Sequence, residues 1–465
     1  MVPLTLAIIA INIVAIVFAA FVRGRAKEIS IASAALSLAI SLYMVFLFAT
    51  SGAQSSVTYI PYLNVALSFG LSGISSVLLL MAEIIILVTA VSGNTERAGL
   101  LASSALISLF QISAVGLFTS TNLLLFFVFW DIGIVAMFLM INLLGSEMRH
   151  NASVNFVLYE LFASSMLLLA IILLYAYLPA HSLNIGYITS AAGSLPLYIK
   201  TIVLISMFIA FMTNMAIFPM HLWLPDAYTE ASTQGSMLLS GVLTKFGGYG
   251  MLILFALPIA ANYTGYVAAL AIVSVVYASF MLIKQKDLKR VIAYSAMLEM
   301  GVILVAVAAS NSIATEGAVY GMFSQGLSMA LAFLAVGVIK SIYDERNIDR
   351  LRDIVSGARS TAYMLAIAML SIIGFPFTSG FVSEILIFFG STQSFELYGL
   401  LPLVGILVMG GYFYHIISRC FLSRSRPTKA GGSPDITERF GFYALSVLIV
   451  LVGVLPFLVL GLLKL

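Results

Sequence analysis

The segment FIAFMTNMAIFPMHLWLPDAYTEASTQGSMLLSGVLTKFGGYG, residues 208–250, determines how the rest of the chain is interpreted. It begins as an apolar run, is interrupted by Pro219 and Pro225, and becomes apolar again around one cation, Lys245. A helix broken at membrane depth leaves backbone groups unpaired, which hydrocarbon tolerates only where protein or a water-filled cavity supplies partners. A lysine in the next span is also costly unless water or a carboxylate accompanies it. The segment therefore predicts a polar path through a bilayer.

The composition is typical of a polytopic membrane protein. Of the 465 residues, 62% are hydrophobic and only 9% are charged, whereas soluble domains carry about 25% charged residues. One cysteine, Cys420, is too few for a disulfide framework or an iron–sulfur cluster. The four histidines are scattered without metal-ligand spacing. We therefore predict no metal and no cofactor in this chain.

Hydrophobic runs of about 20 residues, the length that crosses a bilayer, predict an all-α protein with about 14 transmembrane helices. The predicted spans are residues 3–22, 29–50, 66–92, 99–118, 122–144, 153–178, 197–220, 233–256, 263–283, 290–309, 316–340, 361–390, 398–421 and 441–463. Nineteen of the 22 lysines and arginines fall in the odd-numbered connections between these spans or at the span ends that border them, and none in the even-numbered connections. By the positive-inside rule, both termini lie outside a multi-pass protein of the cell membrane. The net charge of +3 thus reflects topology and indicates no nucleic acid partner.

Two spans are broken in similar surroundings. FPMHLWLPDAY interrupts the seventh span, and GFPFTSGF, residues 374–381, interrupts the twelfth. Each is the fourth span in a block of five, spans 4–8 and 9–13, and paired broken helices in inverted repeats mark ion or substrate paths near the midplane. We therefore predict two inverted five-helix repeats. The expected units are a three-helix region at 1–96, the first repeat at 97–260, the second at 261–430 and a C-terminal helix at 431–465.

Ionisable side chains inside the spans indicate where such a path runs, because charges at membrane depth are usually functional. Six positions lie well inside spans: Glu83, Asp131, Lys245, Glu299, Glu384 and His415. Each could instead form a structural pair with a neighbouring helix. Lys200 and Glu160 lie near span ends, where we expect long side chains to reach the interface.

Four of these positions, on spans five, eight, ten and twelve, predict a lateral row of protonatable groups: Asp131, Lys245, Glu299 and Glu384. A carboxylate, or its proton, that moves near a buried lysine switches that lysine between its charged and neutral forms. One charge crossing 100 mV is worth about 2.3 kcal/mol, which is enough to drive such a switch. The row therefore predicts proton transfer without a metal.

Four segments carry a resemblance to a known family. They are FFVFWDIGIVAMFLMI (126–141), HLWLPDAYTEASTQGSMLLSGVLTKFGGYG (221–250), RVIAYSAMLEMG (290–301) and GFPFTSGFVSEILIF (374–388). The chain resembles the antiporter-like membrane subunits of respiratory complex I, of the Mrp sodium/proton antiporters and of the membrane-bound hydrogenases. It is most similar to the M-type subunit of NADH:quinone oxidoreductase, because Glu384 follows the twelfth-span break where L- and N-type subunits usually carry lysine.

The resemblance implies a fourteen-helix fold with two inverted repeats that translocates protons, or sodium, through the membrane. It implies partners of two kinds: other antiporter-like and small membrane subunits, and peripheral redox subunits with iron–sulfur clusters. Such a chain is not catalytic alone. It is a membrane subunit of a translocating oxidoreductase that resembles NADH:quinone oxidoreductase or a membrane-bound hydrogenase.

The resemblance also assigns roles by motif. Asp131 stands where the family has a span-five glutamate, Lys245 matches the span-eight lysine, and Glu384 matches the span-twelve acid of M-type subunits. These matches imply that the three residues carry protons. His221 and Asp226, beside the seventh-span break, are interpreted either as a proton entry or as a structural contact at the interface, and both roles stay open.

Besides the aspartate at position 131, the chain departs from the family at three further positions. Asn214 replaces the span-seven lysine, and Glu299 and Gln325 replace histidines in spans ten and eleven. We expect an altered relay in which Glu299 acts in place of histidine. Two other functions stay open: a stand-alone or Mrp-type cation/proton antiporter subunit, and a scaffold subunit that has lost transport with the lysine.

Overall fold

The computed structural model describes residues 1–51, 55–60, 65–93, 97–421 and 433–464. The N-terminal elements are α1 (Val2–Phe21), α2 (Ala26–Ser51), β1 (Ser55–Ile60), β2 (Val65–Gly70), α3 (Gly73–Ser92), α4 (Arg97–Thr119), α5 (Leu123–Leu144), α6 (Arg149–Tyr177) and α7 (Ile185–Ala191). The central elements are α8 (Leu197–Asn214), α9 (Trp223–Glu230), α10 (Thr233–Leu238), α11 (Thr244–Phe255), α12 (Thr264–Leu282), α13 (Leu288–Ala309) and α14 (Ser312–Tyr343). The last elements are α15 (Ile354–Gly357), α16 (Arg359–Ile372), α17 (Ser379–Phe395), α18 (Pro402–Ile416), α19 (Ile436–Val454) and α20 (Phe457–Leu463).

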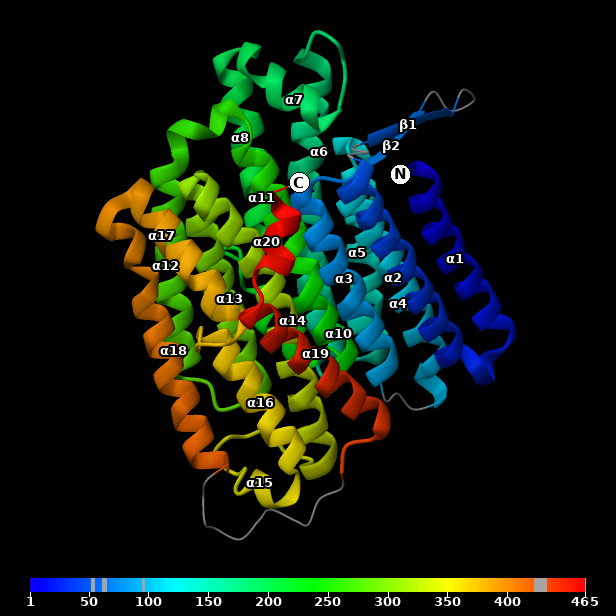
Figure 1. Ribbon diagram of the computed structural model, residues 1–465, viewed down its shortest axis with the longest axis vertical. Coiled ribbons are helices and arrows are strands. Elements are labelled where there is room, and N and C mark those ends of the chain that lie inside the picture. Colours follow the sequence, from blue (N-terminus) through cyan, green and yellow to red (C-terminus); the bar gives the residue numbers. More distant parts are fainter. Residues whose placement is uncertain (52–54, 61–64, 94–96, 422–432, 465) are drawn as a thin grey trace.

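The predicted all-α membrane fold is confirmed. Within the described ranges, 13 helical spans are long and apolar enough to cross a membrane, and the predicted twelfth span is divided between the shorter helices α16 and α17. The span formed by α10 and α11, together with α13 and α14, is almost fully buried, whereas α1 is mostly exposed. Figure 1 shows α14 near the middle of the bundle, α1 along one edge and α18 along the other. The interior is therefore built by the spans that carry Lys245, Glu299 and Gln325.

Two predicted span boundaries are wrong. The third span was expected from residue 66, but residues 65–70 form β2, which pairs antiparallel with β1. Helix α3 starts only at Gly73, because the Ser72 side chain accepts a hydrogen bond from the Ser75 amide and caps the helix there. The last span, expected as one helix, ends at Val454 and resumes as α20 after Pro456, whose missing N–H interrupts a helix.

The break in the seventh span lies between α8 and α9. Ala216 has a positive φ of 54° and the Phe218–Pro219 peptide is cis. The indole N–H of Trp223 donates to the carbonyl of Thr213 at 2.9 Å, and the amide of Phe218 donates to the Ser274 hydroxyl at 3.1 Å. Protein groups thus replace the helical partners that the break removes, as a membrane interior requires.

The break in the twelfth span lies between α16 and α17 and is stabilised by hydrogen bonds between buried hydroxyl groups. Ser328 donates to Ser371 at 2.7 Å, and Ser324 and Ser379 share a hydrogen bond of 2.7 Å. Both contacts join the central helix α14 to the broken span. The break is therefore held against the interior of the bundle.

The α7 and α15 segments lie at opposite ends of the bundle (Figure 1), as alternating spans require for one even-numbered and one odd-numbered connection. Three of the basic residues in the last odd-numbered connection, at positions 424, 426 and 429, lie outside the described residues, as do the predicted unit boundaries near 96 and 430. The two inverted repeats and the four units stay predictions.

Candidate functional site

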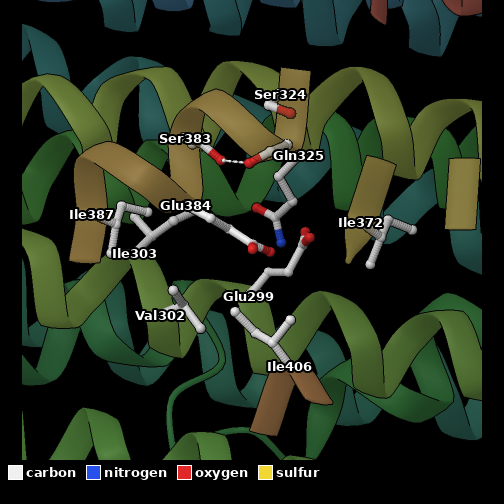
Figure 2. Close-up of a pocket in the computed structure, with 12 residues that line it drawn as sticks. Glu299, Val302, Ile303, Ser324, Gln325, Ile372, Ser383, Glu384, Ile387 and Ile406 are labelled. Carbon is white, nitrogen blue, oxygen red and sulfur yellow. Dashed lines mark hydrogen bonds between the residues drawn. The ribbon is translucent and has the colours of Figure 1, made fainter. Parts of the chain in front are cut away.

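Three polar side chains from different helices converge inside the bundle. Figure 2 shows Glu299 of α13, Gln325 of α14 and Glu384 of α17 pointing toward one another. They line a cavity with about 20 Å³ of space for the centres of water molecules, which is room for on the order of one water. Glu299 Oε2 and Gln325 Oε1 are buried without a hydrogen-bond partner in the described part of the chain. The site is therefore polar, small and able to bind a bridging water.

Gly374 lets the Glu384 carboxylate approach the break in the twelfth span. Gly374 has a positive φ of 66°, a conformation that other residues adopt at a cost. A Cβ at this position would overlap the Glu384 carboxylate. The loop at the break and the acid that follows it thus fit together only with glycine at residue 374.

Lys245 is fully buried at the start of α11, directly after a π-helical turn, Leu239–Leu243. Its amino group donates to the backbone carbonyl of Ser240 and lies 3.4 Å from the Thr244 hydroxyl. Among the described residues, no carboxylate lies within the 4.0 Å of an ion pair with Lys245. Neutral oxygens therefore bind the amine, and π-helical turns of this kind are frequent at functional sites.

Glu299 connects Lys245 to Glu384. Its carboxyl group lies close enough to both side chains for their charges to interact, attractively with Lys245 and repulsively with Glu384. The helices α11, α13 and α17 that carry the three residues are packed in this order. The structure therefore brings three of the four predicted row residues into one electrostatically connected group.

The fourth residue, Asp131 of α5, lies in a different group of contacts. It is half-buried, and the Ser164 hydroxyl of α6 donates to its carboxylate at 2.5 Å. Glu160, one turn earlier on α6, lies close enough to Asp131 for the two carboxyl groups to repel each other. Helix α5 contacts α11 nearby, where the rings of Trp130 and Phe246 have centroids 6.5 Å apart.

The expectation that Glu160 reaches the membrane interface is wrong. Its side chain is fully buried, because α6 begins at Arg149 and places residue 160 about 16 Å along the helix. The amide of Asn214 donates to Glu160 at 3.2 Å and accepts a hydrogen bond from the Gly247 N–H at 2.8 Å. Asn214, which stands where the family resemblance implies a lysine, therefore contacts Glu160. Glu160 is not among the acids that the sequence predicted to carry protons.

His221 and Asp226 lie beside the seventh-span break, as expected, but in separate surroundings. The buried His221 ring lies between Phe218 and Tyr277, with centroid distances of 5.7 and 4.6 Å, and neither ring nitrogen has a hydrogen-bond partner among the described residues. Asp226 accepts a hydrogen bond from Arg290 at 2.5 Å in an ion pair. Proton entry and structural contact both stay open for these two residues.

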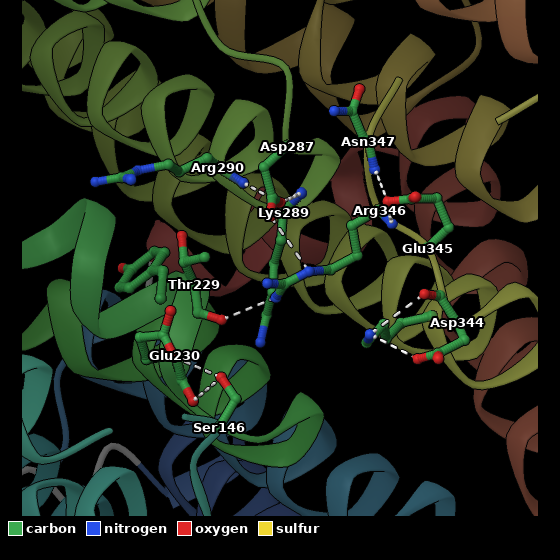
Figure 3. Close-up of polar contacts among 12 residues, drawn as sticks. Ser146, Thr229, Glu230, Asp287, Lys289, Arg290, Asp344, Glu345, Arg346 and Asn347 are labelled. Atoms are coloured by element: carbon green, nitrogen blue, oxygen red, sulfur yellow. Dashed lines mark hydrogen bonds and ion pairs between the residues drawn. The ribbon is translucent and has the colours of Figure 1, made fainter. Parts of the chain in front are cut away.

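A polar network surrounds this region and joins α9 to the connections before α13 and after α14 (Figure 3). Lys289 donates to the Ala231 carbonyl at 2.5 Å, and Arg346 donates to the Thr229 carbonyl at 3.1 Å. An open cavity of about 520 Å³ lies against Lys289, Glu230 and Arg346. Water therefore has access to the end of the span that leads to Lys245.

The remaining intramembrane candidates lie apart from the row. Glu83 is fully buried on α3 and accepts a hydrogen bond from the Gln111 amide at 2.7 Å. His415 is exposed on α18, where its ring stacks on Tyr412 with centroids 5.9 Å apart. Neither contacts Lys245, Glu299 or Glu384 through a hydrogen bond or ion pair in the described ranges.

Residues 120–409 match the family model described as NADH:quinone oxidoreductase/Mrp antiporter, transmembrane. The chain is 32% identical to NADH-quinone oxidoreductase subunit M of Rickettsia felis over 362 residues, which cover 77% of this chain and 73% of the relative. It is 29% identical to the F(420)H(2) dehydrogenase subunit M of Methanosarcina mazei, over 91% of this chain and 88% of that one. In the respiratory complex I of Thermus thermophilus with bound NADH, one chain shares the fold with a TM-score of 0.88 and 24% identity, over 98% of this chain and 97% of that chain.

Proposed function

The chain belongs to the NADH:quinone oxidoreductase/Mrp antiporter transmembrane family, and we propose that it translocates protons as the M-type membrane subunit of a redox-driven, complex I-like pump. The observation that carries this proposal is the position of Glu299, which lines one small cavity with Glu384 and lies within the range of charge interaction of Lys245. A proton on any one of these groups changes the energy of charge on its neighbours. Protonation can therefore pass along the row.

The Glu299 cavity supports transfer between carboxyl groups that do not touch. A water molecule between Glu299 and Glu384 would accept a proton from one acid and donate another to the second, and the cavity has room for it. Gln325 lies beside Glu299 and can donate a hydrogen bond but no proton to it. Glu299 then acts where relatives of this type usually carry a histidine.

The family relatives support a multi-subunit assembly in the cell membrane. The two relatives described above are named as subunits of an NADH-quinone oxidoreductase and of an F(420)H(2) dehydrogenase. In this proposal the α15 end, which carries the basic connections, faces the cytoplasm. Other antiporter-like subunits adjoin the chain in the bilayer, and peripheral subunits with iron–sulfur clusters carry out the electron transfer.

Purification and ion-flux measurements test this function. The detergent-solubilised complex should yield peripheral redox subunits together with this chain by mass spectrometry. Inverted vesicles that contain it should acidify on addition of the electron donor, NADH or reduced F420, and a protonophore should abolish the acidification. Isolation without redox subunits would favour an independent antiporter, and electron transfer without acidification would favour a scaffold, in agreement with the replacement of the lysine by Asn214.

A further inference from the structure

The first half of the membrane domain contains a buried acid, Glu160, with no cation beside it among the residues that the structure describes. Glu160 is fully buried on α6, and its Oε1 atom has no hydrogen-bond partner within the described ranges. The groups that act on its carboxyl are the neutral amide of Asn214 and the acid Asp131. An unpaired carboxylate is expensive in such an interior, and a bound proton removes most of that cost.

The orientation of Asn214 is fixed by its second contact. The Gly247 N–H can only donate, so the atom of Asn214 that it meets, at 2.8 Å, is the carbonyl oxygen. The NH₂ group therefore faces Glu160, at 3.2 Å. A lysine at position 214 would give Glu160 a counter-ion and keep it ionised, whereas the amide binds it without adding charge.

Close packing of α8 on α11 depends on the glycine in this contact. A Cβ on Gly247 would lie 2.7 Å from the Phe211 carbonyl oxygen and 2.9 Å from Asn214 Oδ1, which is closer than side chains normally approach. Gly247 is two residues beyond Lys245. The backbone that fixes Asn214 is thus the same turn of helix that carries the lysine.

Two hydroxyl groups, of Tyr228 and Thr244, lie in the surroundings of Glu160 and Lys245. The buried phenol of Tyr228 is within electrostatic reach of Glu160 and lies beside the Thr244 side chain. Its oxygen makes no hydrogen bond that meets normal geometry with the described residues. Thr244 Oγ1 lies 3.4 Å from Lys245 Nζ. Tyr228 is thus a polar group near the acid, and Thr244 a polar group beside both Tyr228 and the lysine.

We infer that Glu160 is the proton-carrying residue of the first half, and that it passes its proton to Lys245 through the hydroxyls of Tyr228 and Thr244. In this step the O–H bond of the Glu160 carboxyl breaks and an N–H bond forms on the neutral Lys245 amine, which leaves a carboxylate and an ammonium. Each hydroxyl accepts one proton and gives up one, so neither changes. Asn214 and Gly247 are positioning residues. The inference rests on the proposed function and assigns the donor to Lys245 within it.

The test uses the intact complex in inverted membrane vesicles, with whichever of NADH or reduced F420 the wild-type vesicles oxidise. Glu160→Gln keeps the size of the side chain but cannot carry a proton, so we expect proton uptake to fall about 10-fold or more. The infrared difference spectrum between the donor-reduced and oxidised complex should lose the carbonyl band of a protonated carboxyl group. Glu83→Gln is the matched control, because Glu83 is equally buried and also bound by an amide, and it should keep both signals.

Asn214→Lys gives a second, independent readout. The added cation should ionise Glu160 and remove the same infrared band, even if Glu160→Gln fails to assemble. Wild-type proton uptake in Glu160→Gln, or a band that persists in either variant, would overturn the inference. Lys245→Ala separates this outcome from failure of the proposed function. If proton uptake is lost in Lys245→Ala but kept in Glu160→Gln, only the role of Glu160 is contradicted. If proton uptake is kept in both variants, the proposed function itself is contradicted.

Discussion

The amino group of Lys245 donates its hydrogen bond to the backbone carbonyl of Ser240, five residues earlier, across a π-helical turn. The lysine is thus held by a neutral group, while Glu299 acts on it through space. A lysine in a tight ion pair with a carboxylate would resist losing its proton. The observed arrangement leaves the lysine sensitive to changes in charge on its neighbours, as a relay residue must be.

Proton translocation should require the titratable carboxyl group of Glu299 and not merely the shape of its side chain. Glu299→Gln keeps the side-chain volume but removes the acid, so we expect proton uptake by vesicles to fall about 10-fold or more. Glu299→His restores a group that titrates near neutral pH and should recover part of the uptake. Unchanged uptake in Glu299→Gln would show that the relay does not pass through residue 299.

Gly374→Ala tests the fit between the twelfth-span break and Glu384. Residue 374 has a positive φ, which costs a non-glycine residue about 1–2 kcal/mol, and the new methyl group would displace the Glu384 carboxylate. We expect a lower thermal unfolding temperature and slower proton uptake. Gly411→Ala is the control, because Gly411 lies in α18 with open space around its Cβ position; an equal loss in both variants would contradict the argument.

Asp349 should make the stability of the α15 end depend on pH. Its carboxylate binds Lys286 at 2.9 Å and Arg419 at 2.8 Å, and the hydrogen bond from Lys286, with the charges of both, holds the pKa of Asp349 below its ordinary value. Because the native pKa is lowered, the stabilisation is fully present above the unfolded pKa of about 3.9 and is lost as the pH falls through the native pKa.

Asp349→Asn should therefore lower the unfolding temperature slightly at pH 7, since exposed ion pairs contribute little. The difference from wild type should shrink below about pH 4. Unfolding of the solubilised protein followed by tryptophan fluorescence across this pH range measures it. A difference that stays constant down to pH 3 would assign the effect to packing and not to charge.

Proline and glycine made both broken spans predictable, because these residues interrupt a helix wherever they occur in it. The antiparallel pair β1–β2 was not predictable in the same way, since the apolar residues 65–70 continue directly toward α3. Glu160 was missed because its depth depends on where α6 begins, which hydropathy alone does not fix to within a turn. The partner of Asn214 was hidden for a similar reason: it is this acid on α6, and only side-chain geometry reveals the contact.

The central claim is that protons pass along a row of buried groups through Lys245. Proton uptake by inverted vesicles with the wild-type, Lys245→Ala and Lys245→Arg complexes tests it most directly, because arginine keeps the charge but does not release its proton. The account predicts that both variants assemble and that uptake falls about 10-fold or more in each. Wild-type uptake in Lys245→Arg would contradict it, since a fixed charge would then be sufficient.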